Sequence, residues 1–420
     1  MAFDFACSRA IGEDTLGFGR LVMDATYPLS RRGFVGGLAT TVGYLSLSPS
    51  TARAAEVLIG QGAGMVERPF AADDYDSYAK LAANENPYGP PESVMNAMTQ
   101  AFKYANRYSY PDGNLIAEIA KHHDVLPDNI LLGAGSGEIL SVAALALLGG
   151  GRKVIGVDPT FMTVYQYAAG VKADSVRIPL LADYRQDIPA MIHATRNNWR
   201  DVGFVYLCNP NNPTGRIITA AEVKSLLDGI PEDVPVLIDE AYHHFVNDSA
   251  YATAIPYVKE GRPVIVTRTF SKIAALAGMR LGYAVAPPEL INRLRPHSIA
   301  SINALVKLGG VAALRDTESQ ARVKQVTIEL REKTTRALQD IGYEIIPSDA
   351  NFFMVNLKRS VQPVIDDFKT RGVLVGRPFP PMTQHLRVSI GSPSEMQRFM
   401  TAFREIMPVS GKATGDTGKR

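Results

Sequence analysis

The sequence predicts an α/β fold, with a large, mainly parallel sheet covered by helices and a smaller α+β domain after it. Strand-like apolar runs alternate with helical stretches from about residue 84 onward, which is typical of a sheet layered with helices. Several runs are apolar throughout, as strands buried on both faces of a parallel sheet are. Beyond about residue 288 the pattern changes to one long helix candidate and shorter strands, which predicts the second domain.

The expected elements follow this pattern along the chain. Strands of the large domain are expected at 130–133, 153–157, 202–207, 234–239 and 263–267, and helices at 137–148 and 220–227. In the small domain, helices are expected at 319–341 and 394–407, and strands at 351–357, 373–375 and 385–390.

Domain boundaries follow from the same changes of pattern. We expect a leader at 1–54, an N-terminal arm with part of the small domain at 55–105, a large domain at 106–300 and a small domain at 301–410. The final residues, 411–420, are polar and rich in glycine, so a disordered tail is expected there.

Composition excludes several classes of function. The chain has 420 residues, 46% of them hydrophobic and 20% charged, which provides ample apolar material for a core. Lys and Arg number 44 against 42 Asp and Glu, for a net charge of +2, so neither nucleic acid nor an acidic membrane is expected as the main partner. Cys7 and Cys208 are the only cysteines, and no Cys/His cluster predicts a metal site.

The N-terminal segment resembles a twin-arginine export signal. Arg31 and Arg32 lie in the string SRRGFV, a mildly apolar run follows to residue 47, and the string ARA at 52–54 offers a cleavage site. Because about 20 apolar residues are needed to cross a membrane, this run is too short for a transmembrane helix. We expect a mature protein that is periplasmic or secreted and not inserted in the membrane, with Met1 or Met23 as the start. The alternative is a leader retained on a cytoplasmic protein.

The string Thr269-Phe-Ser-Lys272 ends an expected strand. A lysine can form an imine with an aldehyde, and a nearby cation or a pocket of low polarity makes it nucleophilic by lowering its pKa. The Ser271 hydroxyl and Arg280, eight residues beyond Lys272, could bind a phosphate. The alternative for Lys272 alone is a solvated surface residue.

Three further strand ends carry polar residues that could bind one ligand. Asp239 follows three apolar residues, and a carboxylate at the end of a buried strand could hold a protonated pyridine nitrogen; a helix N-cap is the alternative. The loop NPNNPTG at 209–215 could direct an Asn amide at a phenolate oxygen, or be an ordinary turn. The string GAGSGE at 133–138 could use backbone N–H groups and Ser136 to bind a phosphate, or be a helix cap.

With these motifs the chain resembles the fold-type I pyridoxal-phosphate aminotransferases, and within them the histidinol-phosphate aminotransferase group. The resemblance covers roughly residues 81–403. It implies a fold with a large sheet of seven strands. It also rests on the strings NENPYG at 84–89, YPD at 110–112, DPTF at 158–161 and HLRVSIG at 385–391.

The resemblance implies a role for each matching residue. Lys272 would hold pyridoxal phosphate as a Schiff base and act as acid and base, and Asp239 would pair with the pyridine nitrogen. Asn212 and Tyr242 would hydrogen-bond the phenolic oxygen, and Phe161 would stack on the ring. The phosphate ligands it implies are Gly135, Ser136, Gly137, Ser271, Arg280 and, from the neighbouring subunit of a homodimer, Tyr110, with Tyr108 as the alternative.

The resemblance also implies the substrates, an amino donor and a 2-oxo acid acceptor exchanging the amino group by ping-pong chemistry. Arg387 would grip the substrate's anionic group with its planar fork. Asn86, Tyr88, Asn351 and Arg377 would also face substrate, or be structural. The family's Val-Arg pair appears here with a glycine inserted, at 375–377, which leaves the donor open. Alternatives are a decarboxylase or lyase on the same scaffold, and a non-catalytic protein that binds pyridoxal phosphate or an amino acid.

Overall fold

The computed structural model describes residues 72–108, 111–298 and 301–407. The chain divides into two compact units, Met1–Ile59 and Gly60–Arg420, and every described residue belongs to the second. The predicted leader and tail, together with Tyr110, lie outside the described residues, so what was predicted for them stays a prediction.

The main sheet has seven strands between residues 130 and 285. They are β2 (Ile130–Gly133), β3 (Lys153–Asp158), β4 (Ser175–Pro179), β5 (Val202–Cys208), β6 (Val236–Asp239), β7 (Val264–Thr269) and β8 (Gly282–Val285). Their order across the sheet is β2-β8-β7-β6-β5-β3-β4. β8 runs in the opposite direction to the other six strands, so the predicted α/β fold with a mainly parallel sheet is confirmed.

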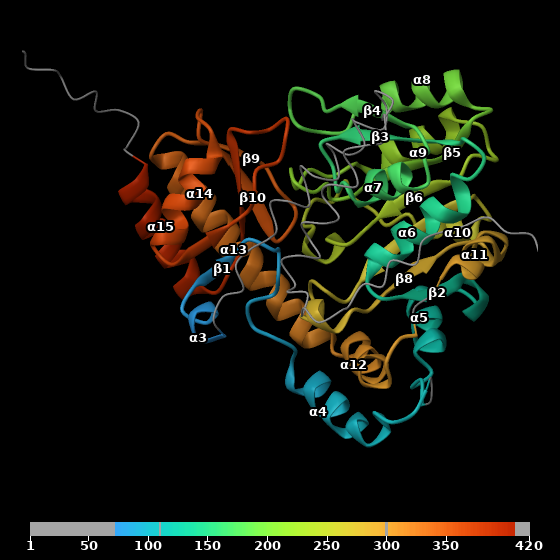
Figure 1. The fold of residues 1–420 in the computed structure, drawn as a ribbon, viewed down its shortest axis with the longest axis horizontal. Coiled ribbons are helices and arrows are strands. Elements are labelled where there is room, and N and C mark those ends of the chain that lie inside the picture. Colours follow the sequence, from blue (N-terminus) through green and yellow to red (C-terminus); the bar gives the residue numbers. More distant parts are fainter. Residues whose placement is uncertain (1–71, 109–110, 299–300, 408–420) are drawn as a thin grey trace, which may run out of the picture. The chain divides into compact units, whose positions relative to one another are not determined.

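Helices cover both faces of this sheet (Figure 1). Because successive side chains of a strand point to opposite faces, Leu237 of β6 packs in one apolar layer and Val236 and Ile238 in the other. The first layer contains α6 (Ser136–Leu147), α7 (Thr163–Gly170) and α11 (Pro288–Leu294). The second contains α5 (Leu115–His123), α8 (Ile188–Asn198), α9 (Ala220–Gly229), α10 (Ile255–Lys259) and α12 (Ala304–Arg315).

The C-terminal part builds two smaller sheets. In one, β10 (Phe352–Asn356) lies between β9 (Glu344–Ile346) and β12 (His385–Ser389), with both pairs antiparallel. In the other, β1 (Ala79–Leu81) of the N-terminal arm pairs in parallel with β11 (Val373–Val375). The remaining helices are α3 (Ala72–Tyr75), α4 (Glu92–Ala101), α13 (Thr317–Asp340), α14 (Val361–Thr370) and α15 (Pro393–Ile406).

Two contacts tie the arm and α12 into the fold. Glu395 of α15 accepts a hydrogen bond from the backbone N–H of Lys80 at 2.9 Å, which holds β1 against the C-terminal domain. Gly309 and Gly310 let α12 pack closely on its neighbours, because a Cβ on Gly309 would lie 2.7 Å from Met98 of α4. A Cβ on Gly310 would lie 2.5 Å from Leu281, which precedes β8, and 3.3 Å from Leu115 of α5. The first helix after residue 300 therefore packs with the larger domain, while the predicted domain boundaries stay a prediction.

The topology brings several strand ends to one edge of the main sheet. β2, β3, β5, β6 and β7 run in the same direction, so Gly133, Asp158, Cys208, Asp239 and Thr269 all end at that edge. Ligands of parallel α/β sheets bind at such an edge. No helix within the described ranges is long and apolar enough to cross a membrane.

Candidate active site

A cavity of about 300 Å³ lies at the edge of the main sheet where the parallel strands end. The C-terminal domain and the N-terminal arm complete its wall. From these two come Ala83, Asn84, Arg377, Phe379 and Arg387. The larger domain contributes Ser136, Gly137, Thr160, Phe161, Met162, Cys208, Asn212, Asp239, Ala241, Tyr242, Thr269, Ser271, Lys272 and Arg280.

Lys272 extends into this cavity from the segment that follows β7. Its Nζ donates a hydrogen bond to the carbonyl oxygen of Ala83 at 3.3 Å, and the side chain is half-buried. Burial, and then the cation of Arg387, lower the pKa of Lys272 to about 8. At pH 7 about one tenth of the amine is therefore neutral, which is the nucleophilic form.

Asp239 is the last residue of β6 and is 2% exposed. Its Oδ1 accepts hydrogen bonds from Thr267 Oγ1 at 3.1 Å and from the backbone N–H of Ala241 at 3.2 Å. Burial raises the pKa of this carboxyl to about 6. A protonated ring nitrogen beside it would favour the ionised form, since an opposite charge stabilises a buried carboxylate.

Two amides converge on the hydroxyl of Tyr242. Its oxygen accepts hydrogen bonds from Nδ2 of Asn84 at 3.0 Å and from Nδ2 of Asn212 at 3.3 Å. The ring packs edge-on against Phe352, with 5.1 Å between centroids. Burial raises the pKa of Tyr242 above its ordinary value, so the phenol keeps its proton and can donate it to a ligand.

An anion site forms where α6 begins. Gly135 precedes the helix with φ of +82°, and a Cβ there would lie 2.3 Å from Nη2 of Arg280. The guanidinium donates to the carbonyl oxygens of Ala134 at 3.0 Å and Ala277 at 2.9 Å. Free N–H groups at a helix start and an arginine beside them together suit a phosphate. The other predicted phosphate ligands, Ser136, Gly137 and Ser271, line the same cavity.

Two arginines hold a phenyl ring between them on the C-terminal side of the cavity. Phe379 lies 4.5 Å from Cζ of Arg377 and 4.6 Å from Cζ of Arg387, measured from the ring centroid. Arg387 donates from Nη1 to Oδ1 of Asn212 at 2.8 Å and from Nη2 to the carbonyl of Ala82 at 2.6 Å. Its buried Nε has no hydrogen-bond partner in the described part of the chain. Burial lowers the pKa of Arg387 to about 10, so it stays charged at neutral pH.

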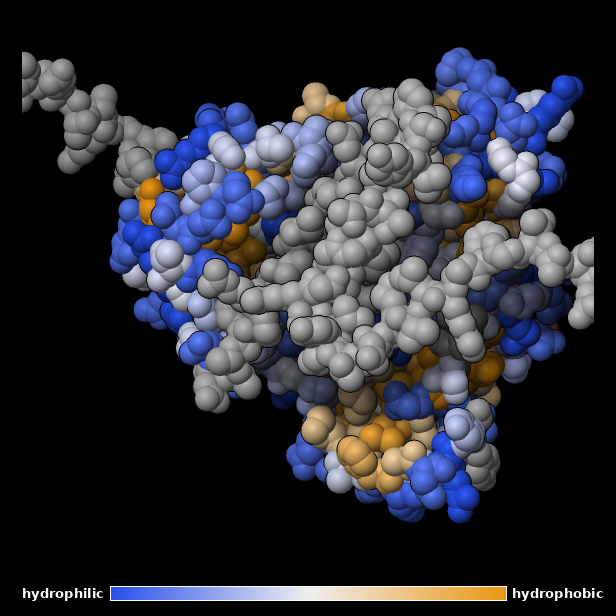
Figure 2. Space-filling view, in the orientation of Figure 1, coloured by the Kyte–Doolittle hydropathy of each residue, from blue (hydrophilic) through white to orange (hydrophobic). Residues whose placement is uncertain are grey.

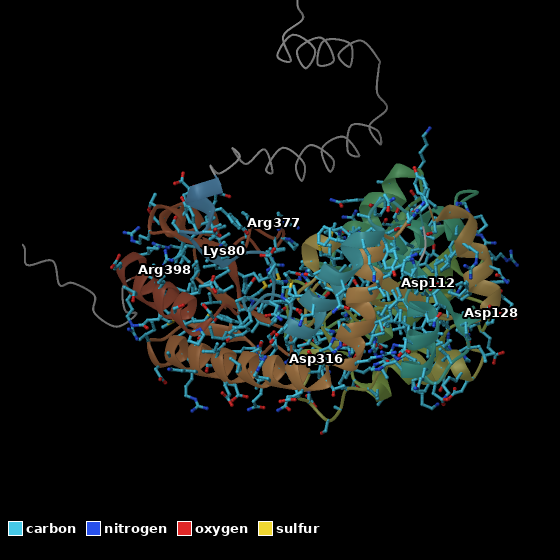
Figure 3. The ribbon with its side chains drawn as sticks, turned by 90° about the horizontal axis from the view of Figure 1, so that it is seen from below. Lys80, Asp112, Asp128, Asp316, Arg377 and Arg398 are labelled. Carbon is cyan, nitrogen blue, oxygen red and sulfur yellow. The ribbon has the colours of Figure 1, made fainter. Side chains whose placement is uncertain are left out.

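The inserted glycine has a structural reason. The N–H of Gly376 donates to the carbonyl of Arg387 at 2.9 Å, and a Cβ at Gly376 would lie 2.8 Å from that oxygen. Only glycine fits this approach without displacing backbone, and it places Arg377 at the cavity. Figure 3 shows Arg377 near the boundary between the C-terminal and larger domains.

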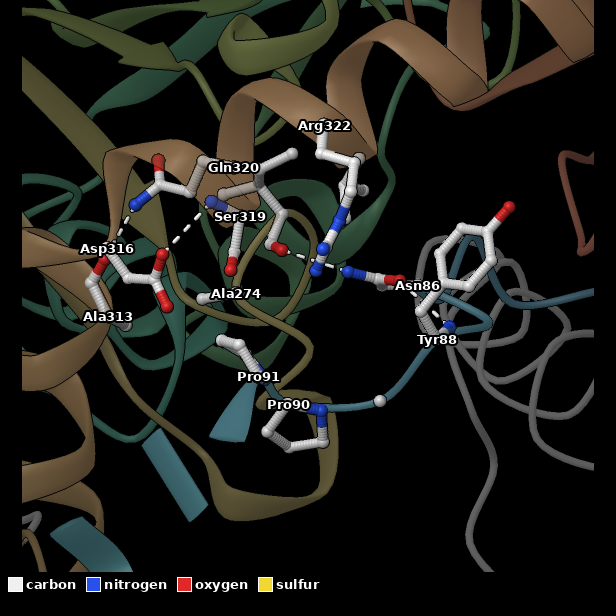
Figure 4. A pocket seen from close by; sticks show the side chains of 13 residues that line it. Asn86, Tyr88, Pro90, Pro91, Ala274, Ala313, Asp316, Ser319, Gln320 and Arg322 are labelled. Carbon is white, nitrogen blue, oxygen red and sulfur yellow. Dashed lines mark hydrogen bonds between the residues drawn. The ribbon is translucent and has the colours of Figure 1, made fainter. Parts of the chain in front are cut away.

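Three of the predicted substrate residues lie elsewhere. Asn86 and Tyr88 line a separate hollow of about 70 Å³, where Nδ2 of Asn86 donates to the carbonyl of Ile273 at 2.9 Å (Figure 4). Nδ2 of Asn351 donates to the carbonyl of Asn84 at 3.0 Å, and Asn351 does not line the larger cavity. Their predicted contact with substrate stays a prediction. Tyr108, the alternative to Tyr110, is 95% exposed.

The sequence reasoning missed several residues of the cavity wall. Asn84 begins the NENPYG string that supported the family resemblance, so the string marked it without giving it a role. Phe379 follows the arginine that the inserted glycine places, and aromatic residues beside paired cations could have been suspected. Thr160, Cys208 and Thr269 end or closely follow strands, and this position was the signal that could have indicated them as cavity residues.

Pyridoxal phosphate fits the residues of this cavity. A Cβ at Gly135 would overlap the guanidinium of Arg280, so glycine lets that arginine lie against the start of α6, where a phosphate would bind. Lys272 would hold the aldehyde, Asp239 would pair with the ring nitrogen, and Phe161 would face the ring. Bound there, the cofactor supplies an electron sink for bonds at the substrate's α-carbon. No group of side chains suited to a metal ion occurs within the described ranges.

Comparison with known proteins agrees with this geometry. Residues 76–403 match the family model for class I and II aminotransferases. A histidinol-phosphate aminotransferase of Moorella thermoacetica is 36% identical over 336 residues, covering 78% of this chain and 85% of that protein.

Two solved structures have the same fold. A putative histidinol-phosphate aminotransferase of Erwinia carotovora atroseptica is 31% identical with a TM-score of 0.74, covering 79% of this chain and 97% of that one. The histidinol-phosphate aminotransferase of Sinorhizobium meliloti, solved in complex with pyridoxal 5'-phosphate, is 25% identical with a TM-score of 0.71, covering 86% and 98%. The chain therefore belongs to the class I and II aminotransferase family and is a pyridoxal-phosphate-dependent aminotransferase.

Proposed function

We propose that this aminotransferase takes its amino group from a donor that carries two anionic groups, or a phosphate such as that of histidinol phosphate, and passes it to a 2-oxo acid such as 2-oxoglutarate. Small-molecule donors and oxo acids follow from the family. The choice of an anionic donor rests on the charges of the cavity, and histidinol phosphate is suggested by the names of the relatives.

One observation carries the proposal: the cavity has more cations than its cofactor needs. Among the residues that the structure describes, four cations line it, Lys272, Arg280, Arg377 and Arg387, against the one carboxylate of Asp239. Lys272 would be bonded to the cofactor, and Arg280 would bind the cofactor's phosphate. Within the described residues neither Arg377 nor Arg387 forms an ion pair, so two guanidinium groups remain for anions of the substrate.

The chain's own residues divide the work of the reaction. Arg387, fixed by Asn212, would hold an anionic group by a bidentate fork, and Arg377 would hold a second one. Lys272 Nζ would move a proton to and from the α-carbon, because its lowered pKa leaves it neutral for part of the cycle. Asp239 would keep the ring nitrogen protonated throughout.

A panel of amino donors tests the proposal. The purified holoenzyme is mixed with glutamate, aspartate, histidinol phosphate, alanine or leucine, and the visible absorbance of the lysine-bound cofactor is followed. We expect glutamate, aspartate and histidinol phosphate to convert the cofactor faster than alanine and leucine. Arg377→Met should lower kcat/KM for these donors about 10- to 100-fold, as the loss of one charged hydrogen bond does, and change it little for alanine.

The matched control is Arg404→Met, which removes an exposed arginine of α15 outside the cavity. It should change no kinetic constant. Equal losses for anionic and neutral donors in Arg377→Met would refute the assignment of a second anion site, because a general disturbance of the fold acts on every donor alike.

The same assay separates amino transfer from lyase chemistry. With a donor alone, a transaminase stops after one half-reaction, with the cofactor in its amino form, until a 2-oxo acid is added. A decarboxylase or lyase regenerates the lysine-bound absorbance without any oxo acid. Recovery of that absorbance without oxo acid would contradict transamination.

We also propose a homodimer whose subunits share active sites. A groove of about 760 Å³ is lined by residues 104–108, by Met279 and by residues 301–305, directly beside Tyr110 in the sequence. Met95 and Phe102 are 47% and 63% exposed, and Figure 2 includes apolar surface in the region of α4 and α12. Sedimentation would give a dimer mass, and Tyr110→Phe should weaken cofactor binding. A monomer that is fully active would contradict the proposal.

We further propose that the protein is exported by the twin-arginine route. The route carries folded proteins, which suits an enzyme that acquires its cofactor on folding. Replacing Arg31 and Arg32 with lysine should leave active enzyme in the cytoplasm, whereas the unaltered protein should be found outside it, starting near Ala55. N-terminal sequencing of fractionated protein decides this, since a chain starting at Met1 or Met23 in the cytoplasm contradicts export.

A further inference from the structure

The hydrogen bonds around Tyr242 have a defined direction, which follows from the groups that surround its two amide partners. Oδ1 of Asn212 accepts from Arg387, whose guanidinium can only donate. The amide of Asn212 must therefore present Nδ2, and not its oxygen, to the hydroxyl of Tyr242. This fixes one of the two bonds as a donation to the tyrosine oxygen.

Ser389 fixes the other bond. Its Oγ accepts from the backbone N–H of Asn84 at 2.8 Å and its hydroxyl donates to Oδ1 of Asn84, also at 2.8 Å. Were the amide of Asn84 turned over, the hydroxyl hydrogen of Ser389 would lose its one recorded acceptor in the described part of the chain. Ser389 is 1% exposed, so water could not replace that acceptor. Asn84 therefore also donates to Tyr242.

Both acceptor positions of the phenolic oxygen are thus filled by N–H groups. A tyrosine hydroxyl has two acceptor positions and one hydrogen, so that hydrogen must point away from both amides. Tyr242 lines the cavity, and no residue within the described ranges is recorded as accepting from its hydroxyl. The direction left for the hydrogen is the interior of the cavity.

We propose that Asn84 is a positioning residue that directs the hydroxyl hydrogen of Tyr242 into the cavity, toward the phenolic oxygen of pyridoxal phosphate. The inference rests on cofactor binding in this cavity. A hydrogen bond donated to an ionised oxygen stabilises the ionised form, so Asn84 acts through Tyr242 to lower the pKa of the bound cofactor.

The backbone explains why an asparagine serves here. Asn84 has φ of 54°, in the left-handed region that asparagine tolerates better than most residues. Nδ2 of Asn351 donates to the carbonyl of Asn84, which helps hold this turn against the C-terminal domain. Residues of the C-terminal domain therefore hold the backbone of Asn84 and its Oδ1, while Nδ2 of the same side chain donates to Tyr242 of the larger domain.

The test uses the visible absorbance of the cofactor bound to the purified holoenzyme, titrated with pH without substrate. Asn84→Gly removes the amide and accepts the positive φ, so the backbone is not strained. We expect the pKa of the bound cofactor to rise by about 1 unit, the size of one hydrogen bond. Asn114→Gly is the matched control, because Asn114 has φ of 55° and lies exposed at the start of α5. It should leave that pKa unchanged.

A double-mutant cycle shows whether Asn84 acts through Tyr242. Tyr242→Phe alone should raise the cofactor's pKa at least as much, and adding Asn84→Gly to it should cause no further rise. An equal rise in both backgrounds, or no rise in the native background, would overturn the proposal. Ser389→Ala gives a second route, with a smaller rise that Tyr242→Phe abolishes. If the native protein shows no cofactor absorbance, cofactor binding itself fails, which is a separate outcome.

Discussion

Replacing Gly135 with alanine should weaken the binding of pyridoxal phosphate by displacing Arg280. The added Cβ would lie 2.3 Å from Nη2, 2.9 Å from Cζ and 3.1 Å from Nη1 of that arginine. Carbon and nitrogen atoms do not approach so closely without a bond, so the guanidinium must move. It would then lose the position set by its hydrogen bond to the carbonyl of Ala134.

The size of the effect follows from the two consequences of the substitution. Loss of one hydrogen bond between an arginine and a phosphate costs about 1.5–3 kcal/mol, which is about 10- to 150-fold in the dissociation constant. The backbone adds a cost of about 1–3 kcal/mol in folding stability, because the conformation of Gly135, with φ of +82° and ψ of 164°, is one that essentially only glycine adopts. The second cost does not depend on the cofactor.

A matched glycine separates these two costs. Gly150 has φ of +75°, and a Cβ there would meet no atom within 4 Å. Both Gly135→Ala and Gly150→Ala should lower the melting temperature of the cofactor-free protein. Only Gly135→Ala should raise the dissociation constant of pyridoxal phosphate, measured by titrating the cofactor-free protein and following absorbance.

Two results would refute the reasoning. Native affinity for the cofactor in Gly135→Ala would mean that Arg280 does not bind the phosphate, or that it moves at no cost. In an Arg280→Ala background, Gly135→Ala should cause little further loss of affinity. A full additional loss there would mean that the new methyl group acts on the cofactor directly.

Three other predictions follow from the site and its surroundings. Arg387→Lys should raise KM for amino and 2-oxo acids about 10- to 100-fold with unchanged cofactor absorbance, because lysine lacks the planar fork; loss of the cofactor would indicate a structural role. Arg268→Met should lower the free energy of unfolding by about 3–5 kcal/mol in urea titrations, because it leaves the buried carboxylate of Glu240, 2.6 Å away, without its cation. Adding Glu240→Gln should recover part of the lost free energy, and no recovery would contradict the account. Because the pKa of Lys272 is lowered to about 8, the fraction of neutral amine increases as pH rises through that value. The rate of cofactor uptake should therefore rise about tenfold per pH unit below pH 8 and level off above it. A rate independent of pH would contradict this.

Much of the main sheet could be predicted because its strands are buried on both faces. Every residue of β5 is buried, and such strands appear in the sequence as uninterrupted apolar runs. β8 was not predicted as a strand, although the string around Arg280 was recognised for its chemistry. It pairs antiparallel both with β7, which precedes it in the sequence, and with β2, more than 140 positions away, and a short apolar run encodes neither pairing.

The candidate site divides in a similar way. Lys272 and Asp239 follow apolar strands, so the sequence placed them at the sheet edge where the structure has them. The role of Asn84 depends on its contact with Tyr242, 158 positions away, which no local pattern encodes. Asn86, two residues beyond Asn84, lines another hollow in the structure, and its expected contact with substrate stays a prediction.

The most direct test of the account is to map the lysine that carries the cofactor, by reducing the holoenzyme with borohydride and sequencing the labelled peptide by mass spectrometry. We expect the label on Lys272, its loss when an amino donor is added before reduction, and its return when a 2-oxo acid follows the donor. A label on another lysine would contradict the assigned site, and a label on Lys272 that the donor leaves unchanged would contradict amino transfer in this cavity.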